Sequence, residues 1–379
     1  MKYTTSLEAD KKIEQDMKII KEIILKNFNP ISIVLFGGFG HGGGSFRKIG
    51  EKITPLNDYD MYIVSKKKID NKKLEIAGEE CSRAIGKGGL EIVENFNENY
   101  DENKFFHVDL HSIGYGSLKK MFPTQRTADL KTSTIIYGDK KVLEQIPKLK
   151  ISKSDSIRLL FNKINHFAIA EGNLKEIKSI YSVKGLIDLC SALLIYEGKY
   201  NSRYQEREKA FESLKGIPEE LKKWVKKATD SKLNKGYKID NVEEAFIQSK
   251  KWVEWTLKKI LKDYLRTKSE DWTEICNLMY KKLPYTYFSD YLRNKYLFPA
   301  QYYLNIKFFF GGLRKKEFLI KNLFRWKDAG LIVAISLILY FFNEKKEAER
   351  YLRKLTNKTK PLKDRILKLY SIYYLQKMI

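Results

Sequence analysis

The chain has 379 residues, 43% of them hydrophobic and 31% charged, and a formal net charge of +25 at pH 7. This composition suits a folded protein of two or three domains. The positive charge attracts nucleotides, nucleic acid or an acidic membrane surface, unless it only reflects a lysine-rich composition. The three cysteines lie far apart and form no CxxC pair, which argues against a zinc site and a disulfide framework.

The first third of the chain predicts alternating helices and strands. Residues 1–12 are polar and charged, so we expect no signal peptide and a reducing, cytoplasmic setting. Apolar residues at helical spacing predict helices over residues 8–27 and 70–86. Short apolar runs predict strands over residues 31–36, 58–64 and 104–110.

Helical spacing dominates after residue 150. This change predicts an α+β fold in three parts: a mixed-sheet domain over residues 1–150, a helical domain over 151–266 and a C-terminal helical domain over 267–379. The apolar run at 330–342 is shorter than the ~20 residues needed to cross a bilayer. It predicts a buried helix and no transmembrane span, while contact with a membrane surface stays open.

A glycine-rich loop follows the first predicted strand, with six glycines between residues 37 and 44. A loop with so few side chains lets backbone N–H groups approach a polyphosphate, and a helix beginning after Ser45 would add a favourable partial charge. No lysine follows the glycines as in a P-loop, and no βαβ unit with a distal acid follows as in a dinucleotide fingerprint. The loop therefore predicts a phosphate site of another kind.

Two aspartates begin the next predicted strand. Asp58 and Asp60 share one face, because alternate residues of a strand point the same way, and Tyr59, Met61 and Ile63 point into the core. Two neighbouring carboxylates repel unless a cation lies between them, and Mg²⁺ prefers such oxygen ligands. Asp is depleted in strands, so a pair of surface acids is the poorer explanation.

A later strand supplies a third carboxylate. His107, Asp109 and His111 alternate with apolar residues and share one face. Asp109 would complete a three-carboxylate site for two metal ions, which aligns an attacking hydroxyl with an α-phosphate and stabilises the leaving pyrophosphate. The histidines leave a transition-metal site open, but no further histidine cluster supports it, and we expect one of them to hydrogen-bond near the site.

These three features together resemble the nucleotidyltransferase superfamily, which includes DNA polymerase β, the aminoglycoside nucleotidyltransferases and the minimal nucleotidyltransferases. The family pattern is a strand, a Gly-Ser or Gly-Gly pair, a short helix, Asp-x-Asp on the next strand and a third acid on a later one. Gly37-Gly38, Asp58-Tyr59-Asp60 and Asp109 match this pattern. Gly38 stands where serine is commoner, and the long interval before Asp58 implies an inserted loop. The resemblance implies a nucleotidyltransferase-type mixed sheet with flanking helices.

The resemblance also implies an activity: Mg²⁺- or Mn²⁺-dependent transfer of a nucleoside monophosphate from an NTP, with ATP expected, to a hydroxyl acceptor, releasing pyrophosphate. It assigns catalysis and metal binding to Asp58, Asp60 and Asp109, and nucleotide binding to Gly37, Gly38, Ser45 and Lys184. Lys184 is included because kanamycin-type relatives supply a lysine from a helical domain. A surface pair of Lys184 with Asp188, four residues on, explains it otherwise.

Two questions stay open. A nucleotidyltransferase-like domain without catalysis would be a nucleotide sensor or scaffold module, although the presence of all three carboxylates favours an enzyme. The acceptor is RNA, a small hydroxylated molecule or a protein side chain, and Arg203, Tyr204 and Arg207 are further candidates to contact it or the phosphates. Residues 290–310 mix aromatic and basic side chains, as RNA-binding surfaces do, but core packing, with a strand near 302–310, explains them equally well.

Overall fold

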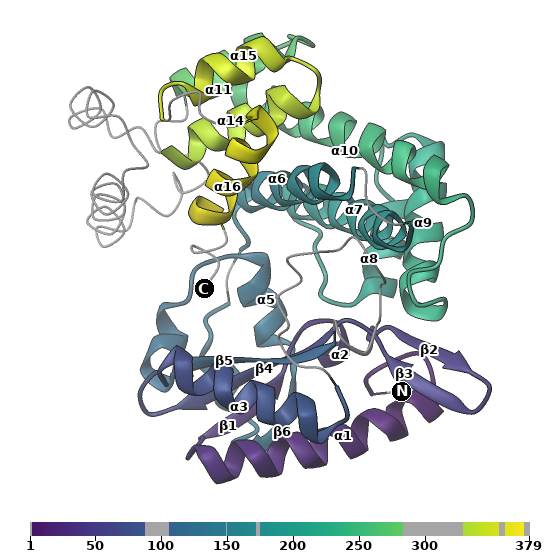
Figure 1. The fold of residues 1–379 in the computed structure, drawn as a ribbon, viewed down its shortest axis with the longest axis vertical. Coiled ribbons are helices and arrows are strands. Elements are labelled where there is room, and N and C mark those ends of the chain that lie inside the picture. Colours follow the sequence, from purple (N-terminus) through teal and green to yellow (C-terminus); the bar gives the residue numbers. More distant parts are fainter. Residues whose placement is uncertain are drawn as a thin grey trace. The chain divides into compact units, whose positions relative to one another are not determined.

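The computed structural model describes residues 2–87, 106–148, 150–171, 175–282, 329–355 and 361–374 (Figure 1). The chain divides into two compact units. Unit 1 comprises Met1–Ile151 and Gly172–Ser249, and unit 2 comprises Ser152–Glu171 and Lys250–Ile379. The mixed segment at 290–310, with its expected strand, lies outside the described residues.

Unit 1 contains a four-stranded mixed sheet in the order β5-β4-β1-β6. β1 (Ser32–Leu35) pairs antiparallel with β4 (Asp58–Ser65) and with β6 (Thr134–Gly138). β4 pairs in parallel with β5 (His107–Gly114), so the two strands that carry the aspartates lie side by side (Figure 1). The α+β fold class expected from the sequence is confirmed.

Apolar side chains cover the sheet on both faces. On one face, α1 (Leu7–Asn27) and α3 (Asn71–Ala84) pack over Tyr59, Met61 and Ile63, which are fully buried as predicted. On the other face, Val34, Tyr62 and Val64 pack against apolar residues from the segments that flank β6. These segments are η1 (Tyr115–Lys120), α5 (Gln125–Lys131) and η2 (Val142–Gln145). Burial on both faces explains why β4 continues as an unbroken apolar run after its aspartates.

The glycine-rich segment forms one helical turn and then a hairpin. α2 (Gly37–Gly40) follows β1 directly, and β2 (Phe46–Ile49) pairs antiparallel with β3 (Lys52–Pro55). A strand rather than a helix therefore follows Ser45, so no helix N-terminus adds its partial charge at that point. Gly50 has φ +58°, which allows the two-residue turn that closes the hairpin. This hairpin is the inserted loop before Asp58.

Three helices and the first residues of α10 (Val242–Leu265) complete the described part of unit 1. The three helices are α7 (Lys175–Tyr196), α8 (Tyr204–Glu212) and α9 (Glu219–Asn234). They pack on one another, and α9 also contacts β2. Among the described residues, α7 is the helix long and apolar enough to cross a membrane. Its most apolar window is 72% buried, and the core helix of a globular domain passes the same test, so this is weak evidence for a span.

Unit 2 is helical where the structure describes it. Its elements are α6 (Lys153–Ala170), α11 (Trp272–Lys282), α14 (Ala329–Phe341), α15 (Lys345–Leu352), α16 (Leu362–Tyr374) and the C-terminal part of α10 (Val242–Leu265). The apolar run predicted as a buried helix forms α14, whose side chains from Leu331 to Leu339 are almost fully buried. That prediction is confirmed.

These two units differ from the expected parts at 1–150, 151–266 and 267–379. α6 packs against α14 of unit 2, although it directly follows the sheet domain in the sequence. The chain then returns to unit 1 and leaves it again within α10. Helical spacing shows that a helix forms, but it does not show which other helices cover its apolar face.

Candidate functional site

The three aspartates of the motif lie on the strand pair β4–β5. Asp60 is the register partner of Asp109, and Asp58 is the partner of His107. In the described part of the chain, one group of side chains has the spacing to hold a metal ion: Asp60, Asp109 and His111, with ligand atoms within 4.8 Å of one another. Asp58 shares their face but lies outside this compact group.

The two central carboxylates have different surroundings. His111 Nε2 lies 3.1 Å from Asp109 Oδ2 and 4.0 Å from Asp60 Oδ1. Burial opposes ionisation of Asp109, but the hydrogen bond and charge of His111 outweigh it, so the pKa of Asp109 falls below its usual value. Burial, and then the charge of Asp58, raise the pKa of Asp60 well above its usual value. Asp60 is thus crowded by like charge, which a cation between the carboxylates would relieve.

Arg126, on α5, adds a fixed positive charge to this face. Its Nε donates a 2.6 Å hydrogen bond to the Tyr62 hydroxyl. Its guanidinium carbon lies 5.4 Å from the ring centroid of Phe36 and 5.5 Å from that of Tyr62. The charge of Arg126 opposes the rise in the pKa of Asp60. Nothing in the sequence pattern singled out this arginine.

Gly37 brings the backbone of the glycine loop against the carboxylates. Its φ is +68°, and a Cβ added there would lie 2.7 Å from Asp60 Oδ2. A Cβ at Gly38 would lie 3.0 Å from the carbonyl oxygen of Gly43 and 3.5 Å from Lys232 Nζ. Glycine is therefore required at Gly37 both by backbone conformation and by space.

A histidine ties this loop to the rest of unit 1. His41 Nδ1 lies 2.7 Å from the carbonyl oxygen of Gly37, and Nε2 lies 2.8 Å from that of Asp129 on α5. His41 also lines a cavity of about 650 Å³, together with Lys131, Lys148 and Arg203. None of the three motif aspartates lines that cavity, so it is separate from the carboxylate cluster.

A buried lysine faces the glycine loop from α9. Lys232 is 5% exposed, and its Nζ donates to Ser45 Oγ at 3.2 Å and to the Tyr237 hydroxyl at 2.8 Å. The Asn57 amide nitrogen donates to the same hydroxyl at 2.8 Å. No carboxylate pairs with Lys232 among the described residues. A buried charge without a counterion is costly, so this position favours an anionic ligand.

Two lysines, Lys232 and Lys184, lower the pKa of Tyr237. Burial would raise the pKa of Tyr237, but the charges of Lys232 and Lys184 and the hydrogen bond from Lys232 lower it to about 8. Burial likewise disfavours the charged form of Lys232, yet its aromatic neighbours Tyr204 and Tyr237 raise its pKa. Lys232 therefore keeps its positive charge at neutral pH.

Lys184 lies in the same cluster, on α7. Its Nζ is 5.8 Å from the ring centroid of Tyr237. Burial lowers the pKa of Lys184, but Tyr237 and then Asp58 more than compensate, and the pKa lies above its usual value. Its charge also acts on Asp60. Lys184 thus lies within electrostatic reach of the carboxylates, rather than in isolation on the surface.

The structure therefore brings most of the sequence-derived site residues together: Asp60, Asp109, Gly37, Gly38, Ser45 and Lys184, with Asp58 beside them. Arg126, Lys232 and Tyr237 were not predicted from the sequence. Lys232 did carry a signal, because it continues the apolar stripe of α9 formed by Leu221, Val225 and Ala228. A lysine on such a stripe is buried, and a buried lysine needs an explanation.

Arg207, a further candidate from the sequence, is used for contacts within the protein. It is buried, and its guanidinium donates to Ser191 Oγ and to the carbonyl oxygens of Asn201 and Ser202. These bonds fix the turn between α7 and α8. Arg203 lines the separate cavity beside His41.

Comparisons with known proteins give little sequence similarity. No protein-family model and no curated protein matches the chain. Among solved structures, the chain is similar to the spectinomycin adenyltransferase AAD(9) from Enterococcus faecialis, solved with ATP and spectinomycin. The identity is 17% and the TM-score 0.39, over 63% of this chain and 98% of that chain.

Proposed function

We propose that this protein is a metal-dependent nucleotidyltransferase that transfers a nucleoside monophosphate, with ATP as the expected donor, to a hydroxyl acceptor. One observation carries the proposal: the in-register pair Asp60–Asp109, the Gly37 backbone and the buried Lys232 converge within unit 1. Carboxylates for a cation and ammonium groups for phosphates are the two requirements of this chemistry.

The residues present fit a divalent cation. Asp60 and Asp109 would hold it, with Asp58 or His111 as a further ligand, and the oxygen-rich donor set suits Mg²⁺ or Mn²⁺. When bound, the cation would neutralise charge on the triphosphate and stabilise the leaving pyrophosphate. The raised pKa of Asp60 supports this assignment, because burial and the charge of Asp58 disfavour its ionised form and a bound cation would favour it again.

The lysine cluster would bind the triphosphate. Lys232 and Lys184 supply positive charge, Ser45 and Tyr237 supply hydroxyls, and the Gly37–Gly38 backbone allows close approach. Tyr237 stays mostly protonated at neutral pH and so does not repel a phosphate. A nucleotide here would provide the counterion that Lys232 lacks among the described residues.

Asp109 is the proposed general base. Interaction with His111 keeps Asp109 ionised, so it can accept the proton of the acceptor hydroxyl. The hydroxyl oxygen then bonds to the α-phosphorus, the bond from that phosphorus to the bridging oxygen breaks, and pyrophosphate leaves. Arg126 places a positive charge near the carboxylates, where negative charge develops.

The test is incubation with each α-labelled NTP and Mg²⁺ or Mn²⁺, against RNA, cell metabolites and the protein itself as acceptors. We expect labelled product and pyrophosphate with at least one pair, loss of both on chelation, and loss in Asp60→Asn. The exposed Asp240, replaced in Asp240→Asn, is the matched control and should keep activity. Nucleotide binding without pyrophosphate release under every condition would instead establish the sensor or scaffold alternative.

The proposal includes a cytoplasmic location. All three cysteines are buried and unpaired with one another, as expected of a protein in a reducing compartment.

A further inference from the structure

The positive charge of the chain is concentrated in unit 2. Unit 2 has 32 Lys and Arg against 14 Asp and Glu in 150 residues, a net charge of +18, whereas unit 1 has 40 against 33 in 229 residues, a net charge of +7. A lysine-rich composition would enrich both units in lysine, but it would not remove acidic residues from one of them. The asymmetry therefore points to an anionic partner for unit 2.

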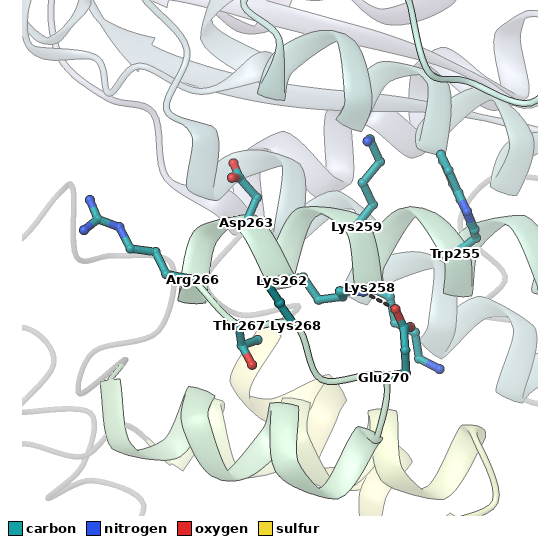
Figure 2. A pocket seen from close by; sticks show the side chains of 9 residues that line it. All are labelled: Trp255, Lys258, Lys259, Lys262, Asp263, Arg266, Thr267, Lys268 and Glu270. Carbon is teal, nitrogen blue, oxygen red and sulfur yellow. Dashed lines mark hydrogen bonds and ion pairs between the residues drawn. The ribbon is translucent and has the colours of Figure 1, made fainter.

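Unit 2 has a basic groove around the C-terminal part of α10. Its volume is about 700 Å³ (Figure 2). Five cationic side chains, one indole and two carboxylates line it, together with Thr267: Trp255, Lys258, Lys259, Lys262, Asp263, Arg266, Lys268 and Glu270. Figure 2 shows Trp255, Lys259 and Asp263 extending from one side of α10, as their four-residue spacing requires.

The cations of this groove are not all used within the protein. Lys258 pairs with Glu254 at 3.2 Å, and Lys262 pairs with Glu270. The side chains of Arg266 and Lys268 have no ion-pair partner among the described residues, and both are exposed. Within the part of the chain that the structure describes, Lys259 makes a cation–π contact and no ion pair, with its Nζ 5.7 Å from the Trp255 ring centroid. Three positive charges and an indole are therefore available to a ligand.

Helix stabilisation explains only part of this pattern. Cations in the last turn of a helix interact favourably with its dipole, which accounts for Lys262 and Arg266 near the end of α10. Lys258 and Lys259 lie more than a turn earlier, and Lys268 lies beyond the helix, so the dipole does not account for them. Trp255 is also not needed to fill a core, because it remains partly exposed while its neighbour Trp252 is buried.

We propose that this groove binds single-stranded nucleic acid, with an unpaired base stacked on Trp255 and the phosphates held by Lys259, Arg266 and Lys268. Aromatic faces interleaved with basic side chains are the recognition chemistry of single strands, because every base has a stackable face and every linkage a charge. This assigns a polynucleotide hydroxyl as the acceptor class, a step that rests on the proposed transferase activity.

An anionic membrane fits the groove less well. Membrane surfaces are bound by cations together with exposed large aliphatic or aromatic residues that insert between lipids. The exposed large hydrophobic residues of the described chain are Leu7, Ile19, Ile76, Phe122, Tyr137 and Ile247. None of them lines the groove. The aromatic residue of the groove, Trp255, is only partly exposed, and no exposed aliphatic side chain lies among the lining residues to insert with it between lipids.

The binding test uses the full-length protein and a fluorescent single-stranded RNA without stable secondary structure, measured by anisotropy over a salt series. The triple variant Lys259→Glu, Arg266→Glu, Lys268→Glu should bind at least ten-fold more weakly. The slope of log affinity against log salt should become shallower by about 2, because each of the three lost phosphate contacts contributes ~0.7 to it. The control Lys67→Glu, Lys72→Glu, Lys119→Glu changes exposed lysines of unit 1 by the same charge and should stay within about two-fold of wild type.

A second variant tests the stacking. Trp255→Ala should weaken RNA binding by about ten-fold or more, while leaving the salt slope unchanged, because stacking releases no counterions. Equal losses in the groove and control triples would overturn the proposal, since the effect would then be one of net charge. So would binding to vesicles of phosphatidylcholine and phosphatidylserine that depends on these residues while RNA binding does not.

Measuring nucleotide transfer to RNA distinguishes a failure of the proposed groove from a failure of the proposed transferase activity. Wild-type protein should label the RNA from α-labelled ATP, and the groove triple should need at least ten-fold more RNA for the same rate. RNA binding without transfer to any acceptor would refute the transferase and leave the binding surface standing. Efficient transfer to a small molecule, unaffected by the groove triple and with no RNA binding, would refute the surface and leave the transferase standing.

Discussion

Units 1 and 2 carry positive charge in different ways. In unit 1 the charge is nearly balanced overall, but Lys232 is buried beside the glycine loop, and Lys184 lies near Tyr237, which accepts a hydrogen bond from Lys232. In unit 2 the surplus is large, and Lys259, Arg266 and Lys268 are exposed. Two unit charges 4 Å apart interact by about 1 kcal/mol in water and about 4 kcal/mol in a protein-surface environment. Two sheltered lysines can therefore hold one triphosphate, whereas an exposed groove needs several cations and remains sensitive to salt.

The largest expected effect is on catalysis in unit 1. Asp109→Asn is nearly isosteric and removes the charge and most of the basicity, so pyrophosphate release should fall by about 10²–10⁴-fold. Binding of Mg²⁺–ATP should remain measurable, because Asp58 and Asp60 are intact. Steady-state kinetics with a competent acceptor give the first quantity, and calorimetric titration gives the second. Full transfer by Asp109→Asn would refute the proposed role of this residue.

The next effect contrasts a buried with an exposed lysine. Lys232→Met should weaken Mg²⁺–ATP binding by about 10–100-fold, the loss expected for charge-assisted hydrogen bonds in a sheltered site. Lys259→Met, in the groove of unit 2, should leave ATP affinity unchanged. Thermal unfolding without nucleotide should show that Lys232→Met still folds, although it loses the hydrogen bonds to Ser45 and Tyr237, so that its lower ATP affinity is not a loss of fold.

Equal ATP affinities for Lys232→Met and wild type would remove Lys232 from the nucleotide site. Equal losses in Lys232→Met and Lys259→Met would show that net charge, rather than burial, governs nucleotide binding.

A third effect depends on pH. The pKa of Tyr237 is about 8 in the folded protein and 10.0 for an ordinary tyrosine, so between these values the unfolded chain binds more protons. The free energy of unfolding should therefore rise with pH across this window, by about 2–3 kcal/mol in total, and this gain should be lost as pH falls through 8. Tyr237→Phe should abolish the rise, whereas Tyr137→Phe, at a more exposed tyrosine, should keep it. Chemical denaturation at several pH values, with the tyrosinate absorbance followed in parallel, measures both.

The smallest expected effect distinguishes the cost of a positive φ from the cost of a steric clash with Asp60. Gly37 and Gly216 both have positive φ, but an added Cβ meets Asp60 at Gly37 and nothing within 4 Å at Gly216. Gly216→Ala should cost about 1–2 kcal/mol of stability and leave activity intact. Gly37→Ala should add a loss of transfer, because it displaces Asp60. Denaturant unfolding and steady-state rates distinguish the two, and equal activities would show that the contact with Asp60 is not required.

Strand parity explains why part of the site could be predicted. A strand alternates its side chains with a period of two, so Asp58 and Asp60 had to share a face and Tyr59, Met61 and Ile63 had to share the other. Placing Asp109 beside Asp60 required only that the third strand pair in parallel with the second. The apolar run at 330–342 likewise predicted a buried helix, and α14 is that helix.

Long-range packing explains what was missed. The lysine that faces the glycine loop from α9 is 194 residues from Gly38 in the sequence, and Arg126 reaches Tyr62 across 64 residues. No periodicity links such positions, because their neighbours depend on how α9 and α5 pack. The same reason explains the unit boundaries, since α6 joins unit 2 while α7 to α9 join unit 1.

The sequence by itself determined the local features: the three strands β1, β4 and β5, the shared face of Asp58 and Asp60, the glycine loop, the net charge and the buried helix. These depend on backbone geometry and composition within a short window of chain. Only the tertiary structure decided that Lys232 and Tyr237 meet Ser45, that His111 rather than Asp58 completes the compact group with Asp60 and Asp109, and that the charge surplus belongs to unit 2. Those features depend on burial and on contacts between segments far apart in the sequence. Such contacts form only when the apolar faces of helices and strands pack against one another.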